Sequence, residues 1–173
     1  LPEFTILGAT TEAGTLERPL RDRFKHTYTL QPYSVDDLLK IVTINAEKLQ
    51  MKINPDALRQ IARISRGTPR VANTNLEWVR DWQIATGATT VIRPDIKTAM
   101  AIKGVDMDGL TIGDRVYLEA LRKQPNPVGL NTLGSLTGID ENTIVDKIEP
   151  YLLRAGLIYK TSRGRVPNRT LGV

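Results

Sequence analysis

The sequence predicts a mainly helical chain with a short α/β segment at its start. Two observations predict this fold class: apolar residues repeat at helical spacing in successive stretches from residue 34 onward, and β-branched or alternating apolar runs occur near the two ends. A length of 173 residues allows one ordinary domain or two to three small ones. We therefore divide the chain into three parts, residues 1–33, 34–104 and 105–173.

The composition excludes several classes of protein. Hydrophobic residues make up 40% of the chain, and no apolar run approaches the ~20 residues of a spanning helix. The start lacks the pattern of a signal peptide, so we expect a cytoplasmic location and no membrane contact. The absence of cysteine and the single histidine exclude disulfide frameworks and cysteine zinc sites, and we expect no metal site. A net charge of +5 favours an anionic partner.

The first part, residues 1–33, reads as strand, loop, short helix and strand. Strands are predicted over Phe4–Ala9 and His26–Leu30, with a helical turn over Pro19–Phe24 between them. An isolated pair of strands is marginal in water, so these strands must complete a sheet whose other strands lie outside this chain. Because Leu1 is not Met and precedes such a run, we expect the back part of a longer protein.

The second part, residues 34–104, reads as a small helical bundle. Ser34 followed three residues later by Asp37 predicts a helix N-cap. Pro69 after Thr68 predicts another helix start, and Gly67 predicts the end of the helix before it. The predicted helices cover residues 35–49, 54–65, 69–86 and 93–103.

The third part, residues 105–173, predicts three helices followed by a hairpin. The helices are expected over Asp114–Lys123, Leu130–Leu136 and Asp140–Ala155, and the hairpin turns at Thr161–Gly164. This order matches a winged-helix domain. Pro150 lies inside the third helix, where it should kink the axis or cost roughly 3 kcal/mol.

Two candidate site residues lie in the first part. Thr11 follows the first predicted strand, where a hydroxyl can orient a water or a phosphate oxygen, although threonine is also an ordinary turn residue. Arg23 belongs to a basic cluster around Pro19–Phe24. Its guanidinium either serves a phosphate on another subunit or lies on a solvated face with Asp22 as counter-charge.

A third candidate is the helix start formed by Thr68, Pro69 and Arg70. A cation in the first turn of a helix is disfavoured by the helix dipole by about 0.3 to 1 kcal/mol, so we expect Arg70 to bind an anion. The free backbone N–H groups of that turn favour a nucleotide phosphate as that anion. The alternative is that Arg70 pairs with an acidic side chain.

The predicted hairpin supplies a fourth candidate. From Arg154 to the end the chain holds five basic residues and no acid. This composition fits contact with a nucleic-acid backbone, and a solvated hairpin with no such role is the alternative. The candidate contact residues are Lys160, Thr161, Arg163, Gly164 and Arg165.

Six segments, in chain order, resemble the RuvB family of bacterial Holliday-junction branch-migration motors, which are AAA+ ATPases. They are Gly8–Thr11, Pro19–Phe24, Gly67–Asn73, Pro127–Leu130, Glu149–Leu152 and Arg163–Arg165. The resemblance implies the end of a AAA+ core in residues 1–33, a helical lid in 34–104 and a winged-helix DNA-binding domain in 105–173.

The same resemblance implies roles for the candidates. Thr11 corresponds to the sensor-1 residue, Arg23 to an arginine finger that reaches a neighbour's ATP, and Arg70 to the sensor-2 arginine. A finger supplied in trans implies a homohexamer of the intact protein, which would act as an ATP-dependent DNA helicase or translocase with Mg²⁺. DNA, as a four-way junction or its duplex arms, and a RuvA-like junction-binding protein are the implied partners.

The sequence also departs from the family. It contains no Gly-x-x-x-x-Gly-Lys-Ser/Thr loop and no Asp-Glu pair after a hydrophobic strand, so we expect no ligands for Mg²⁺ and no ATP hydrolysis by this chain alone. Two alternatives remain open. One is a stand-alone winged-helix DNA-binding module, and the other is a AAA+ subunit of the clamp-loader or initiator type.

Overall fold

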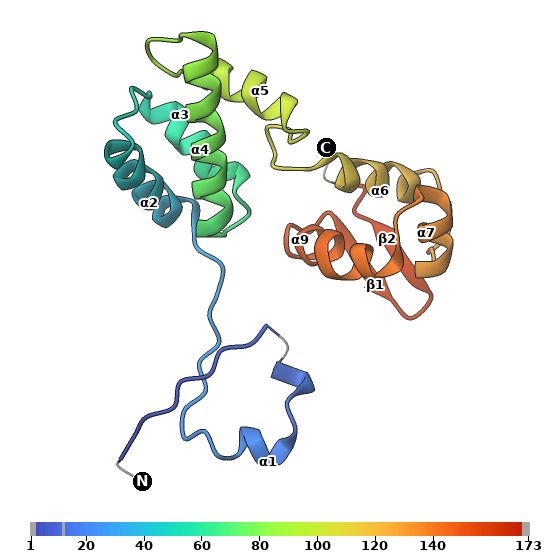
Figure 1. The fold of residues 1–173 in the computed structure, drawn as a ribbon. Coiled ribbons are helices and arrows are strands. Elements are labelled where there is room, and N and C mark those ends of the chain that lie inside the picture. Colours follow the sequence, from blue (N-terminus) through green and yellow to red (C-terminus); the bar gives the residue numbers. More distant parts are fainter. Residues whose placement is uncertain (1–2, 12, 171–173) are drawn as a thin grey trace. The chain divides into compact units, whose positions relative to one another are not determined.

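A computed structural model describes residues 3–11 and 13–170 of the chain. Its contacts divide the chain into two compact units, residues 1–31 and 32–173 (Figure 1). The second unit holds nearly all of the regular structure. Within the described residues, no helix combines the length and apolar content that a membrane span would require.

Among its described residues the first unit contains one 3₁₀ turn, η1 (Ala13–Thr15), and one short helix, α1 (Arg18–Arg21). The strands predicted over Phe4–Ala9 and His26–Leu30 do not form among the described residues. Apolar side chains of both segments face solvent, with Leu7 94% and Leu30 91% exposed. Each segment lacks the neighbouring strands that pairing requires, which is why the β prediction is wrong here.

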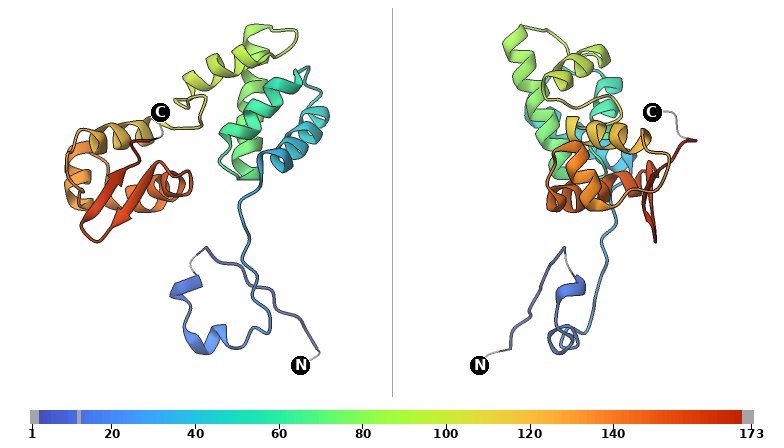
Figure 2. Two further views of the ribbon diagram at one scale, coloured as in Figure 1. Left: turned by 180° about the vertical axis from the view of Figure 1, so that it is seen from behind. Right: turned by 90° about the vertical axis from the view of Figure 1, so that its right-hand side faces the viewer.

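The helical bundle consists of four helices, as predicted. They are α2 (Val35–Lys48), α3 (Pro55–Ile64), α4 (Pro69–Thr86) and α5 (Arg93–Ile102). Ser34 caps α2 by accepting a hydrogen bond from the Asp37 N–H at 3.1 Å, which confirms the predicted helix start. Leu38, Ile61 and Leu76 are fully buried at the centre of one apolar cluster shared by the four helices. Figure 2 shows the bundle from two further directions.

The winged helix follows and has an apolar core of its own. Its helical segments are α6 (Ile112–Arg122), α7 (Leu130–Thr137), α8 (Glu141–Thr143), η2 (Ile144–Ile148) and α9 (Glu149–Arg154). Strands β1 (Ile158–Thr161) and β2 (Gly164–Pro167) pair antiparallel, with Thr161 opposite Gly164. Tyr117 and Leu152 are among the fully buried side chains of this core. Three helices and a two-stranded ribbon confirm the predicted arrangement.

The third helix of the winged helix departs from the single span predicted over Asp140–Ala155. A π-helical segment, η2, separates α8 from α9 and ends immediately before the helix that contains Pro150. Proline donates no N–H, and its ring crowds the carbonyl four residues earlier. The wider π turn accommodates this conflict within a continuous helical path, so the irregularity expected at Pro150 takes this form.

Candidate functional site

The two candidates of the first unit lie on its exposed surface. Thr11 occupies a bend just before η1, and Arg23 occupies a turn that follows α1 rather than the helix itself. Asp22 lies 3.6 Å from the guanidinium of Arg18. Arg23 has no ion pair within the part of the chain that the structure describes. Its guanidinium is therefore available to a group outside this chain.

The start of α4 has the geometry that the sequence predicts. Thr68 is the N-cap residue and Pro69 opens the helix, with Arg70 in its first turn. The Thr68 hydroxyl makes no capping hydrogen bond to the helix, so the first backbone N–H groups remain open to a ligand. Arg70 is exposed, and no acidic side chain among the described residues pairs with it.

The turn before α4 is held by backbone contacts. The Tyr33 N–H donates to the Gly67 carbonyl at 2.9 Å. Gly67 has a φ of 73°, and a Cβ built there would lie 2.8 Å from Cβ of Pro32. Glycine is needed here both for the positive φ and for the close approach. The contact fixes the direction in which α4, and with it Arg70, leaves the turn.

The hairpin tip presents one of the predicted basic residues to solvent. Arg163 is exposed, its N–H donates to the Thr161 hydroxyl at 3.3 Å, and its guanidinium has no partner among the described residues. The Thr161 hydroxyl donates to the Gly164 carbonyl at 2.9 Å, which closes the turn. Arg163 can therefore approach a phosphate without first breaking an internal contact.

Two other basic residues of the hairpin pair with a buried acid, the side chain of Arg165 being 16% exposed and that of Lys160 45% exposed. Arg165 Nε and Lys160 Nζ each lie 2.6 Å from a carboxylate oxygen of Glu149, and the Tyr117 hydroxyl donates to the same carboxylate at 2.9 Å. Glu149 is fully buried. Lys160 and Arg165, which were expected as nucleic-acid contacts, are thus the counter-charges of a buried acid. A carboxylate this deeply buried requires such partners.

These contacts set the charge state of the cluster. Burial by itself would raise the pKa of Glu149, but hydrogen bonds from Arg165, Lys160 and Tyr117 together hold it below its ordinary value of 4.5. Burial and the Glu149 charge raise the pKa of the Tyr117 phenol, so that group stays protonated and donating. The sequence contained one signal for this cluster, the acid Glu149 directly before Pro150 in a predicted helix.

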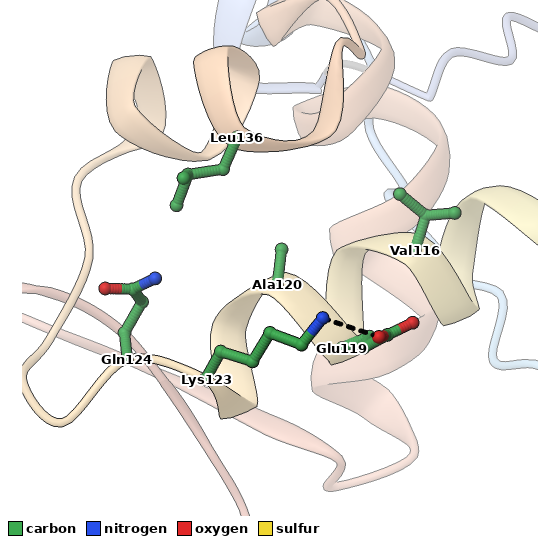
Figure 3. A pocket seen from close by; sticks show the side chains of 6 residues that line it. All are labelled: Val116, Glu119, Ala120, Lys123, Gln124 and Leu136. Carbon is green, nitrogen blue, oxygen red and sulfur yellow. Dashed lines mark hydrogen bonds and ion pairs between the residues drawn. The ribbon is translucent and has the colours of Figure 1, made fainter.

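A shallow hollow lies between α6 and α7 and is lined by Val116, Ala120 and Leu136 (Figure 3). The ion pair between Glu119 and Lys123, 2.7 Å long, lies at its edge. None of the predicted site residues lines it. Within residues 3–11 and 13–170, no group of three or more histidine or acidic side chains could hold a metal ion.

Comparison with known proteins relates both parts of the second unit to one family. Residues 33–106 match the RuvB AAA lid domain, and residues 107–170 match the RuvB C-terminal winged helix domain. The subunit RuvB of the Holliday junction branch migration complex from Rubrobacter xylanophilus is 44% identical over 171 residues, which cover 98% of this chain and 48% of the relative. The corresponding subunit from Lactobacillus gasseri is 43% identical over 167 residues, or 95% of this chain and 49% of the relative.

A solved structure of the Thermotoga maritima RuvB branch migration motor has the same fold. It superimposes with a TM-score of 0.81 at 34% identity, over 91% of this chain and 53% of that structure. A mutant of the same protein gives a TM-score of 0.83 at 35% identity, over 94% of this chain and 55% of the other. The chain thus spans about half the length of the relatives it matches.

Proposed function

The chain belongs to the RuvB family, and from this premise we propose that it forms the nucleotide-sensing and DNA-binding portion of an ATP-driven motor. That motor would drive branch migration at Holliday junctions during recombination and repair. We assign the end of a AAA+ core to residues 1–33, the lid to 34–104 and DNA binding to 105–173. The observation that carries the proposal is the presence in one chain of a helix start suited to phosphate and a hairpin tip with a free arginine.

Arg70 is the residue that we assign to the nucleotide. It has no acidic partner among the described residues and lies in the first turn of α4, beside open backbone N–H groups. An anion there gains from the helix dipole as well as from the guanidinium. Arg70 would therefore contact a phosphate of ATP, and its position would change when that phosphate leaves.

Thr11 and Arg23 are assigned to hydrolysis at the interface between subunits. The free guanidinium of Arg23 suits a group supplied to a neighbour's ATP, where it would stabilise charge that develops on the transferred phosphoryl group. Thr11 would orient the attacking water through its hydroxyl. A finger that acts in trans requires a ring, which we propose to be a homohexamer.

The described residues fit ATP in part and do not fit Mg²⁺. Arg70 and the start of α4 offer cationic and N–H groups to phosphate oxygens. Magnesium prefers carboxylate and water oxygens, and the described residues hold no acidic cluster that would supply them. We therefore place the Mg²⁺ ligands outside this set and derive no step through the ion.

The winged helix is assigned to DNA, which would be a four-way junction or its duplex arms. Arg163 extends from the tip, while Lys160 and Arg165 hold the hairpin against Glu149. Contacts of this kind bind the phosphate backbone and carry little sequence information. We further propose a cytoplasmic location and a RuvA-like protein that holds the junction while the motor pulls on the duplex.

Binding of this chain to duplex DNA tests the assignment of Arg163. We expect Arg163→Ala to weaken binding and to reduce the slope of log affinity against log salt by about one, because one phosphate contact is lost. The measurement is fluorescence anisotropy of a labelled duplex at several salt concentrations. Arg93→Ala is the matched control, since it removes the same charge from an exposed position on α5. Equal affinity and slope for Arg163→Ala and the parent would contradict the assignment.

A further inference from the structure

Arg66 lies between α3 and α4 and extends from the helical bundle into the winged helix. Its φ of 56° is left-handed, a conformation uncommon for a residue with a side chain. The guanidinium donates through Nε to the Gly109 carbonyl at 2.8 Å and through Nη2 to Asp114 Oδ2. One side chain therefore joins the end of α3 to the start of α6.

The winged helix reaches back to the same residue from α9. The ring of Tyr151 lies under the Arg66 guanidinium, with 4.2 Å between the guanidinium carbon and the ring centroid. Arg154 donates to the Arg66 carbonyl at 2.7 Å. Both the backbone and the side chain of Arg66 are thus held by the winged helix, and Asp114, Tyr151 and Arg154 come from two of its helices.

Burial makes this ion pair costlier to break than a surface ion pair. The side chain of Arg66 is 17% exposed and that of Asp114 is 1% exposed. Asp114 also accepts hydrogen bonds from the N–H and hydroxyl of Thr111, both at 2.6 Å, at the start of α6. Its other oxygen has no hydrogen-bond partner among the described residues. Removing Arg66 would leave a buried carboxylate without a cation, which is costly.

The backbones also meet at this point. A Cβ built on Gly109, whose φ is 81°, would lie 2.7 Å from the Ile64 carbonyl oxygen at the end of α3. The Gln60 side chain donates to the Met107 carbonyl at 2.8 Å. These contacts leave little space for sliding between the end of α3 and the turn that leads into α6.

We propose that Arg66 is a positioning residue that latches the helical bundle to the winged helix, so that the two turn as one body. This inference rests on the proposed function in one respect, because it makes Arg66 the coupling between nucleotide and DNA. Arg66 stands four residues before Arg70, in the turn that opens α4. A movement of Arg70 with phosphate would therefore carry the winged helix through a contiguous, tightly packed path.

The latch is tested directly by the distance between the two parts in this chain. The chain contains no cysteine, so Lys48→Cys on α2 and Thr132→Cys on α7 accept spin labels without competing sites. We expect a single narrow distance distribution from double electron–electron resonance, and loss of that narrow distribution in Arg66→Gln. Arg59→Ala is the control, because its partner Asp36 lies 3.0 Å away within the bundle.

Folding of the variant is checked by NMR, since each part has its own core and both sets of signals should persist in Arg66→Gln. Arg66→Lys retains the charge but not the planar fork that serves Gly109 and Asp114 together, so we expect an intermediate width. A narrow distribution in Arg66→Gln, or a broad one in the parent, would overturn the latch.

The coupling is tested in the intact motor by the base pairs of branch migration achieved per ATP hydrolysed. We expect this ratio to fall in Arg66→Gln while hydrolysis continues, and an unchanged ratio would overturn the coupling. If the parent chain failed to bind DNA while the distance distributions were as expected, the proposed function would be contradicted. The role of Arg66 in joining the two parts would still be supported.

Discussion

Glu149 determines what the basic side chains of the hairpin do. It lies fully buried between Lys160 and Arg165, and these two cations satisfy its charge inside the domain. Arg163 has no such partner within the described residues and remains exposed at the tip. Three basic residues that are close neighbours in the sequence therefore differ in their contacts, since two of them pair with Glu149 and one has no ion pair among the described residues.

The Glu149 cluster makes the stability of the winged helix depend on pH in the acidic range. Because its folded pKa lies below 4.5, the carboxylate stabilises the fold fully above that value, and this contribution is lost as the pH falls through the folded pKa. We expect Glu149→Gln to flatten this part of the pH profile of unfolding free energy. Hydrogen exchange of winged-helix amides at several pH values measures this unfolding free energy. An unchanged pH dependence in Glu149→Gln would show that other carboxylates control it.

The start of α4 and the buried ion pairs illustrate what the sequence could and could not predict at this scale. Thr68, Pro69 and Arg70 are neighbours, so local capping rules placed them correctly at a helix start. Glu149 and Arg165 are 16 residues apart, and Arg66 and Asp114 are 48 apart. Pairs at such separations depend on how whole elements pack, which the local spacing of residues does not determine.

Among the elements, the hairpin depends most clearly on one position. Gly164 has a φ of 135°, and a Cβ there would lie 2.4 Å from the Val128 carbonyl oxygen. Val128 and Arg165 exchange two backbone hydrogen bonds, of 2.9 and 2.8 Å, which anchor β2 to the segment before α7. The sequence predicted that Gly164 would permit a turn, and the structure adds the close backbone approach beside it.

Gly164→Ala should therefore displace the hairpin from the body of the winged helix. We expect a loss of about 1 to 3 kcal/mol of unfolding free energy, from backbone strain and the shift that the clash requires. Gly113→Ala is the matched control, because Gly113 lies in the first turn of α6 and a Cβ there would make only an ordinary contact at 3.6 Å with Ile148. Denaturant unfolding followed by circular dichroism compares the two, and equal stabilities would contradict the role given to Gly164.

The elements that the sequence mispredicted share one cause. The strands expected over Phe4–Ala9 and His26–Leu30 carry the correct residue types, but a strand is stable only against a neighbour. Helices satisfy their backbone within one segment, so α2 to α5 could be located by periodicity alone. The π segment before Pro150 lies between these cases, since the sequence marked the position but not the form of the irregularity.

At the scale of the whole molecule, residues 34–170 form two apolar cores, one in the helical bundle and one in the winged helix. The bundle core and the winged-helix core contain different residues, and each closes over helices that are consecutive in sequence. This locality explains why the organisation from residue 34 onward could be predicted. Membership of the RuvB family places the chain in that family rather than with a clamp-loader or initiator subunit, and the motor activity remains our proposal.

The role of Arg23 as an arginine finger is tested by ATP hydrolysis and branch migration in the intact protein with Arg23 replaced by Ala. A synthetic four-way junction is the substrate, and the unaltered protein with its junction-binding partner is the reference. We predict that Arg23→Ala binds ATP normally but loses turnover and branch migration, because the charge supplied across the subunit interface is gone. Normal hydrolysis by the Arg23→Ala protein would contradict the assignment of this chain to a ring-shaped, ATP-driven DNA motor that uses Arg23 as its finger.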